Sequence, residues 1–197
     1  MSMKKVLAFI SIICMIGICS CTQHKQAPKS NVTELVVENT ISADRQAMFL
    51  SHGGNYKWYE TGVLLNNWLD EENDGSFEMV VNVFQVIEMR DSSSFDTFVY
   101  KYQHTLKGTT EGATHGFWVE DYPLNEEQIK VTFADAFAKV MQVNLPKPHT
   151  RQVVLRKQIG PVSSNPQWIF GNQQSQIYVD AVTGEVNDTN PAFKGFI

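Results

Sequence analysis

The hydrophobic and polar positions in the first half of the chain predict one helix followed by strands. A short helix is expected over 43–52, with Ser42 as its N-cap and the glycines after His52 as its end. Strand patterns with alternating or apolar faces follow over 56–65, 77–89, 95–106 and 116–122. The second of these is apolar on both faces at its centre, which is typical of a central strand. Turns are expected over 91–94 and 107–112.

The second half shows the same order of helix and strands. Thr132 and Asp135 have the spacing of a capping box. One apolar helical face follows, made of Phe133, Ala136, Phe137, Val140 and Met141. Strands are expected over 151–159, 167–170 and 176–182. The predicted fold class is therefore α+β, with two helix-plus-antiparallel-sheet units at 41–127 and 128–197.

The last predicted strand ends in a polar turn that contains Asp180, Thr183 and Gly184. Short Asp and Thr side chains can hydrogen-bond the backbone of a turn, and glycine supplies a positive φ. Asp180 has no nearby His, Cys or second acid in the sequence except Glu185. We therefore interpret the three residues as a structural turn and not as a catalytic site.

Four segments of the second half carry a resemblance: the helix around Ala136, the strand 153–156, the segment 166–170 and the stretch 178–185, Tyr-Val-Asp-Ala-Val-Thr-Gly-Glu. Together, over about 129–187, they resemble a PepSY domain. The resemblance implies a PepSY/cystatin-like fold. PepSY domains resemble the propeptides of secreted peptidases, so it also implies binding to an enzyme or cell-wall protein outside the membrane. The first unit lacks this signature, although its order of elements also fits a diverged copy of the second.

The N-terminus has the pattern of an export signal. Lys4 and Lys5 precede an apolar run over 6–17 that is too short to span a bilayer comfortably. The sequence Ile18-Cys19-Ser20-Cys21 resembles a bacterial lipobox, which implies cleavage before Cys21 and lipidation of that residue, for instance with palmitate. The alternative interpretation is a short anchor helix that is never cut.

This pattern predicts a signal peptide over 1–20 and a flexible tether over 21–40. We expect a protein of the bacterial cell envelope, periplasmic or surface-exposed, that a lipid anchor holds at the membrane. All three cysteines lie within the first 21 residues, so the exported part would contain no disulfide. That part carries 14 Lys and Arg against 21 Asp and Glu, a net charge of about −7, which argues against binding to nucleic acid.

The sequence shows no pattern for catalysis, a cofactor or a metal. There is no Gly-x-Ser-x-Gly, no glycine-rich phosphate loop and no zinc-like spacing of histidines. The segment 70–75 resembles the start of a calcium loop, but Val81 stands where that loop needs a Glu, so a hairpin turn is the better interpretation. His104 and His115 are expected at a surface or turn. We expect a protein that is not an enzyme and has no cofactor.

Tyr56, Trp58, Tyr100 and Tyr102 alternate along two of the predicted strands. Such aromatic residues fill a core or anchor a partner, and we assign these four as candidate partner-binding residues. The favoured function is a non-catalytic binding or inhibitory module for a secreted or envelope protein such as a peptidase. The alternative is a small-molecule carrier or an enzyme with a pocket between helix and sheet.

Overall fold

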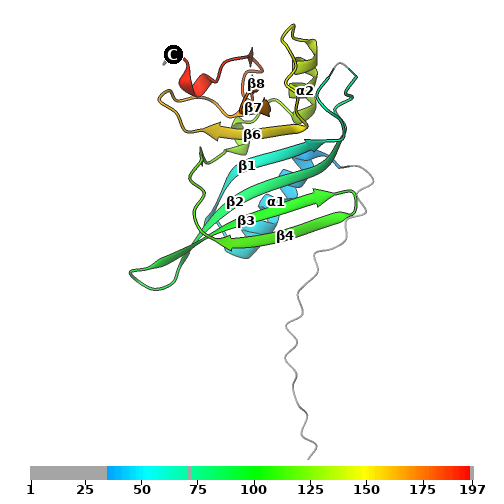
Figure 1. Ribbon diagram of the computed structural model, residues 1–197. Coiled ribbons are helices and arrows are strands. Elements are labelled where there is room, and N and C mark those ends of the chain that lie inside the picture. Colours follow the sequence, from blue (N-terminus) through cyan, green and yellow to red (C-terminus); the bar gives the residue numbers. More distant parts are fainter. Residues whose placement is uncertain (1–34, 71, 196–197) are drawn as a thin grey trace, which may run out of the picture. The chain divides into compact units, whose positions relative to one another are not determined.

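The computed structural model describes residues 35–70 and 72–195, and the α+β class is confirmed (Figure 1). Helix α1 spans Val37–His52 and α2 spans Phe133–Gln142. The strands are β1 (Tyr56–Leu65), β2 (Phe77–Met89), β3 (Phe95–Thr105), β4 (Gly108–His115), β5 (Asp121–Tyr122), β6 (Gln152–Gln158), β7 (Gln167–Asn172), β8 (Ser175–Asp180) and β9 (Val186–Asn187). Two short 3₁₀ helices, η1 and η2, span Glu126–Gln128 and Pro191–Phe193.

All nine strands belong to one antiparallel sheet, in the order β4-β3-β2-β1-β6-β7-β8-β9, with β5 paired to β6 outside this path. Each helix is followed by a meander of neighbouring strands, β1 to β4 after α1 and β6 to β9 after α2. The first full strands of the two meanders, β1 and β6, pair with each other from Glu60–Arg156 to Leu64–Gln152. The two predicted units therefore share one sheet.

Both helices pack on the same face of the sheet. A row of directly paired residues on this face runs from Asn82 through Thr61 and Leu155 to Trp168. Asn82 lies under α1, to which it is hydrogen-bonded, and Trp168 lies against Phe133 of α2 with 5.7 Å between ring centroids. One buried cluster contains residues from both helices and from the strands beneath them. The shared core explains why the described residues belong to a single compact unit.

The helix α1 begins earlier than predicted. It starts at Val37, so residues 37–40 of the predicted tether are helical, and Ser42 lies inside the helix and is not its N-cap. The observed N-cap, Val36, makes no side-chain capping bond. Val37 and Ile41 are both buried in the shared core, so packing sets this end of the helix where a capping side chain does not.

The fourth strand also lies elsewhere than predicted. Residues 108–115, assigned mostly to a turn, form β4, whereas within the predicted strand 116–122 only Asp121–Tyr122 is extended and paired, as β5. Every residue of β4 is exposed, and none of the eight has a large apolar side chain. The strand therefore lacks the alternation that marks a half-buried strand, and backbone pairing with β3 holds it in place.

Candidate functional site

The four aromatic residues predicted at a partner surface do not form one. Trp58 and Tyr102 are buried, at 3% and 6% exposure, and the Tyr102 hydroxyl lies 3.4 Å from Met48 Sδ of α1. Tyr56 and Tyr100 are half-buried and pack against the same core. The assignment is therefore wrong for Trp58 and Tyr102, because their face of the sheet is the one that α1 covers.

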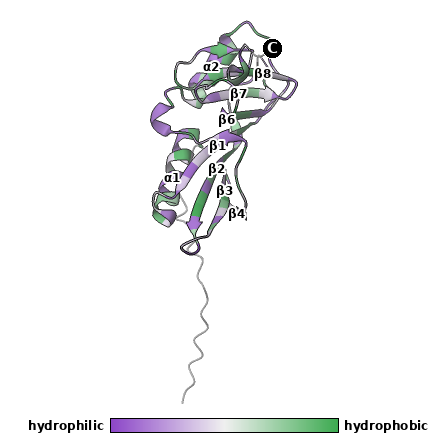
Figure 2. Cartoon of the chain, turned by 90° about the vertical axis from the view of Figure 1, so that its left-hand side faces the viewer, coloured by the Kyte–Doolittle hydropathy of each residue, from purple (hydrophilic) through white to green (hydrophobic). Residues whose placement is uncertain are grey.

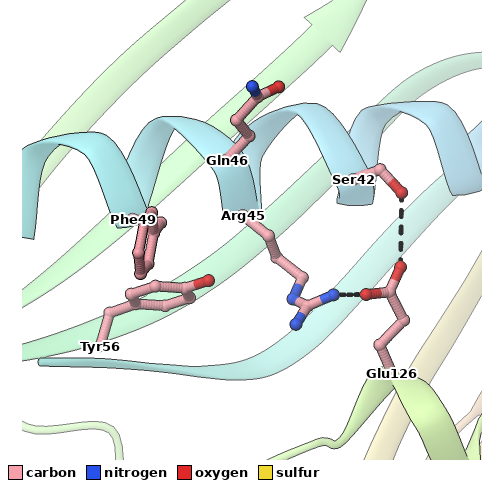
Figure 3. A pocket seen from close by; sticks show the side chains of 6 residues that line it. All are labelled: Ser42, Arg45, Gln46, Phe49, Tyr56 and Glu126. Carbon is pink, nitrogen blue, oxygen red and sulfur yellow. Dashed lines mark hydrogen bonds and ion pairs between the residues drawn. The ribbon is translucent and has the colours of Figure 1, made fainter. Parts of the chain in front are cut away.

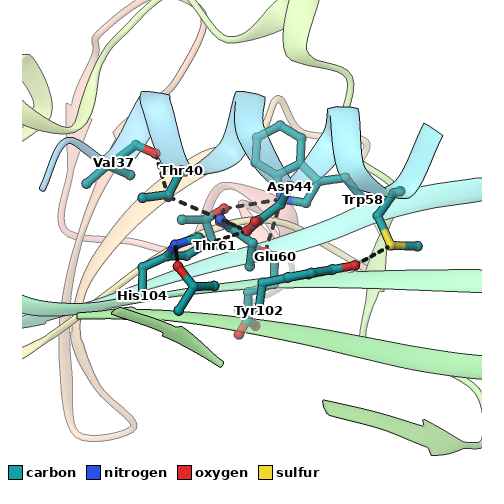
Figure 4. A network of polar contacts seen from close by, with 11 residues as sticks. Val37, Thr40, Asp44, Trp58, Glu60, Thr61, Tyr102 and His104 are labelled. Carbon is teal, nitrogen blue, oxygen red and sulfur yellow. Dashed lines mark hydrogen bonds and ion pairs between the residues drawn. The ribbon is translucent and has the colours of Figure 1, made fainter. Parts of the chain in front are cut away.

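A polar network lies between α1 and the sheet (Figure 4). Asp44 of α1 is 4% exposed, and its Oδ2 accepts a hydrogen bond from Asn82 Nδ2 at 2.7 Å and lies 2.7 Å from His104 Nε2. Asn82 also donates to Thr40 Oγ1 at 3.1 Å, and its Oδ1 accepts from Thr61 Oγ1 at 2.6 Å. These side chains fill the space between α1 and this part of the sheet, where the alternative function required a pocket.

The network reaches the surface through His104. Its Nδ1 lies 2.9 Å from Thr109 Oγ1 on β4, so the imidazole bridges a buried carboxylate and an exposed hydroxyl. In such a row the carboxylate orients the imidazole, and the imidazole can accept a proton from the hydroxyl. The prediction of a surface His104 is wrong, because residue 104 of β3 lies on the face that α1 covers and is 8% exposed. The exposed His115 pairs instead with Phe98 at the other end of the hairpin, near Asp96.

A second charged cluster lies on the face of the sheet opposite the helices, where β1 meets β6. Glu60 lies directly across from Arg156, whose Nε is 3.8 Å from Asp121 Oδ1. Trp118 Nε1 donates to Asp121 Oδ2 at 3.3 Å. Burial, followed by the nearby Asp121 carboxylate, raises the pKa of Glu60 to about 7. Burial also raises the pKa of Asp121, although the Arg156 guanidinium opposes this shift.

Several buried polar atoms of this cluster have no hydrogen-bond partner among the described residues. They include Asp121 Oδ1, Arg156 Nε and Gln158 Oε1. Asp121 and Gln158 are direct cross-strand partners, so their unpaired oxygens belong to one neighbourhood. No local pattern in the sequence indicates this cluster, because Glu60, Asp121 and Arg156 come from three distant segments that only the sheet brings together.

The turn after β8 has the geometry of a structural turn. Asp180 Oδ1 accepts hydrogen bonds from the backbone N–H groups of Val182 and Thr183, at 2.8 and 2.9 Å. Thr183 Oγ1 accepts from the backbone of Glu185, and Gly184 has φ 76°. Burial tends to raise the pKa of Asp180, but these hydrogen bonds and those from nearby side chains outweigh it and lower the pKa.

A shallow hollow of about 250 Å³ lies beside α1 (Figure 3). Arg45 forms an ion pair with Glu126 of η1, and Ser42 donates to the same carboxylate at 3.4 Å. Phe49 and the half-buried Tyr56 line its other side. One side of the hollow therefore holds the Arg45–Glu126 ion pair, and its other side is formed by two aromatic rings.

Three large exposed apolar side chains, those of Ile87, Met89 and Phe95, lie in the β2–β3 hairpin on the face of the sheet opposite the helices. His52 at the end of α1 lies 3.2 Å from Glu88 of β2, which places the end of the helix beside the β2–β3 hairpin (Figure 2). Met89 and Phe95 are cross-strand partners in that hairpin and are 81% and 60% exposed. The apolar end, as we call this group, comprises Ile87, Met89 and Phe95.

The described residues show no metal or membrane-spanning feature. No group of three or more His, Cys, Asp or Glu residues within 35–70 and 72–195 is arranged to hold a metal ion. Neither α1 nor α2 has the length and apolar character that a membrane span needs. Cys21 lies outside the described residues, as does most of the predicted tether.

Comparisons with known proteins give no relative: no protein-family model, no curated protein sequence and no solved structure matches this chain. The site must therefore be interpreted from its own geometry.

Proposed function

We propose that this chain is a lipid-anchored protein of the bacterial cell envelope whose folded part is a non-catalytic binding or inhibitory module for another secreted or envelope protein, such as a peptidase. The signal and lipobox pattern before Cys21 supports the anchor. The PepSY-like sequence around Asp180 supports the class of role. The repeated order of helix and meander supports a first unit that is a diverged copy of the second.

The apolar end is the observation that carries this proposal. Large apolar side chains that gather on a surface usually mark a site where another molecule binds. The group contains Phe95 and Met89, and aromatic residues and Met are enriched at protein interfaces. Met89 and Phe95 lie side by side on two paired strands, so they present a fixed apolar surface to a partner.

An acidic side chain lies beside this surface. Asp91 is in the turn that joins Met89 to Phe95, whereas the paired Glu88 and Asp96 point to the other face of the sheet. Hydrogen bonds from Ser94 and Ser93 lower the pKa of Asp91 to about 2, so this carboxylate stays charged. A charged tip resists entry into the hydrocarbon of a bilayer. A partner protein with an apolar centre and a basic side chain opposite Asp91 fits the apolar end better than a membrane does.

The experiment compares partner capture by three versions of the full chain in native membranes. Wild type is compared with the double variant Met89→Ser/Phe95→Ser. The matched control is Leu106→Ser, since Leu106 is 72% exposed at the opposite end of β3. After cross-linking, we expect wild type and the control to yield the same partner and the double variant to lose it. Equal capture by all three would overturn the proposal.

The anchor is tested separately through Cys21. Cys21→Ala should move the protein from the membrane fraction to the soluble fraction, because the lipid would no longer be attached. Membrane association that persists with an intact signal would contradict the lipid anchor and leave the binding proposal untouched.

A further inference from the structure

The edge strand β4 is open along its whole length. It lies at the end of the sheet and pairs with β3 from Thr105–Gly108 to Phe98–His115 without a shift in register (Figure 1). No other strand within the described residues pairs with its outer side. The opposite edge, β9, has only two residues, so β4 is the long edge of this sheet.

The outer backbone groups of β4 are arranged for pairing. The hairpin Thr105–Gly108 has a two-residue turn, and in such a hairpin the closing pair is hydrogen-bonded. Residues 108, 110, 112 and 114 therefore bond β3, and the N–H and C=O groups of 109, 111, 113 and 115 point outward. Proteins commonly protect an exposed edge with Pro, charged side chains such as Lys, or a bulge; β4 has no Pro, Lys or bulge, and Glu111 is its one acidic side chain.

The side chains along β4 differ from one end of the strand to the other. Ala113 and His115 lie across from Tyr100 and Phe98, and the His115 and Phe98 rings meet edge to face at 5.5 Å. Glu111 lies across from Tyr102 and is exposed. Glu111 takes part in no ion pair among the described residues, so its carboxylate remains available to a cation beside the strand.

We propose that the outer edge of β4 binds an extended segment of a partner protein by strand addition, with a Lys or Arg of that segment opposite Glu111. Main-chain hydrogen bonds supply the attachment, and the cross-strand charge pair selects the segment. The partner segment is thus extended and basic, and this inference rests on the proposed binding function. A second copy of β4 fits poorly, because Gly108–His115 contains Glu111 but no Lys or Arg.

Defined peptides test the proposal on the full chain in detergent. The first probe is the capped peptide Thr-Val-Thr-Lys-Thr-Val-Thr, the second has Glu in place of Lys, and the third is the Lys peptide with alternate amides N-methylated. We expect the Lys peptide to slow amide hydrogen exchange at Thr109, Glu111, Ala113 and His115. The Glu peptide should bind about fivefold more weakly, from a cross-strand charge difference on the order of 1 kcal/mol. The N-methylated peptide should not bind, because it cannot complete the ladder.

Variants of β4 distinguish the contribution of main-chain hydrogen bonds to peptide binding from the contribution of the Glu111 charge. Ala113→Pro removes an outward N–H and should abolish binding, whereas the control Ala113→Val keeps this group and should bind as wild type. Glu111→Lys should reverse the preference between the Lys and Glu peptides. This reversal keeps the test decisive even if the proline variant does not fold. No binding of the Lys peptide at millimolar concentration, slowed exchange elsewhere than β4, or no reversal would overturn the proposal.

The peptide test is independent of the apolar end. Met89→Ser/Phe95→Ser should bind the Lys peptide as wild type does, because both residues lie outside β4. If the peptides fail while envelope capture still depends on Met89 and Phe95, the strand-addition proposal is wrong and the proposed function stands. If the peptides bind β4 but capture does not depend on the apolar end, the proposed use of that end is wrong.

Discussion

The side chain of Glu38 in α1 caps the first turn of α2: its Oε1 accepts a hydrogen bond from the backbone N–H of Phe133 at 2.7 Å. Phe133 is the first residue of α2, so this N–H has no partner within its own helix. The carboxylate also lies at the positive end of the α2 dipole. One side chain thus joins the two helices across 95 positions of sequence.

We expect Glu38→Ala to lower the free energy of unfolding by about 0.5–2 kcal/mol, the usual effect of losing a helix cap. Glu38→Gln should cost less, because the amide oxygen can still accept the bond while the charge is lost. Urea denaturation followed by circular dichroism measures both. Asn39→Ala, at the exposed neighbouring position, is the control and should change little. A Glu38→Ala protein as stable as this control would show that the contact contributes nothing.

Removing Asp44 should destabilise the first half of the sheet. In Asp44→Ala, Asn82 Nδ2 loses its shortest hydrogen bond and His104 Nε2 loses its carboxylate neighbour, both beneath α1. Leaving a buried polar group unpaired costs roughly 1–3 kcal/mol, so we expect a loss of about 1–3 kcal/mol. Thr109→Val removes the exposed partner of the same His104, which water can replace, and should cost less than about 0.5 kcal/mol. Equal midpoints in urea for the two variants would contradict this account.

Glu60 makes stability depend on pH. Its pKa is raised from 4.5 to about 7 in the folded chain, so the folded state binds this proton more tightly than the unfolded state. The contribution is complete below pH 4.5 and is lost as the pH rises toward about 7 and above. Asp121, whose pKa is also raised, acts in the same direction. Unfolding free energies measured from pH 4 to 8 should decline more steeply for wild type than for Glu60→Gln, and parallel curves would refute the assignment.

The stability of the turn at Asp180 should depend on backbone conformation more than on the charge of the carboxylate. Asp180→Asn keeps one oxygen acceptor for the N–H groups of Val182 and Thr183, and we expect a loss on the order of 1 kcal/mol. Gly184→Val should cost more, because φ is 76° there and an added Cβ would lie 2.8 Å from Lys139 Cε. Thermal midpoints rank the two variants. A folded Asp180→Asn protein that loses partner capture would instead make this turn a binding site.

The sequence by itself determined the elements whose side chains alternate between core and solvent. The bounds of β1 and β2 match the predicted segments 56–65 and 77–89, because half-buried or central strands carry a local apolar pattern. The start of α2 was also predictable, since Thr132 accepts a hydrogen bond from the backbone of Asp135 as a capping residue does. The hydrogen bonds of Asp180 were predictable for the same reason, because they join residues only two and three positions apart.

The tertiary structure alone decided the features that depend on contacts distant in sequence. Pairing of Glu60 with Arg156 joins the two halves into one sheet, and no local pattern specifies which strands pair. The exposed strand β4 carries no burial signal, and the early start of α1 follows from the burial of Val37 in a core that both halves build. Tyr102 lies between the exposed residues Lys101 and Gln103, and Trp58 follows the exposed Lys57, as surface aromatics would. Only the placement of α1 over one face of the sheet shows that they belong to the core.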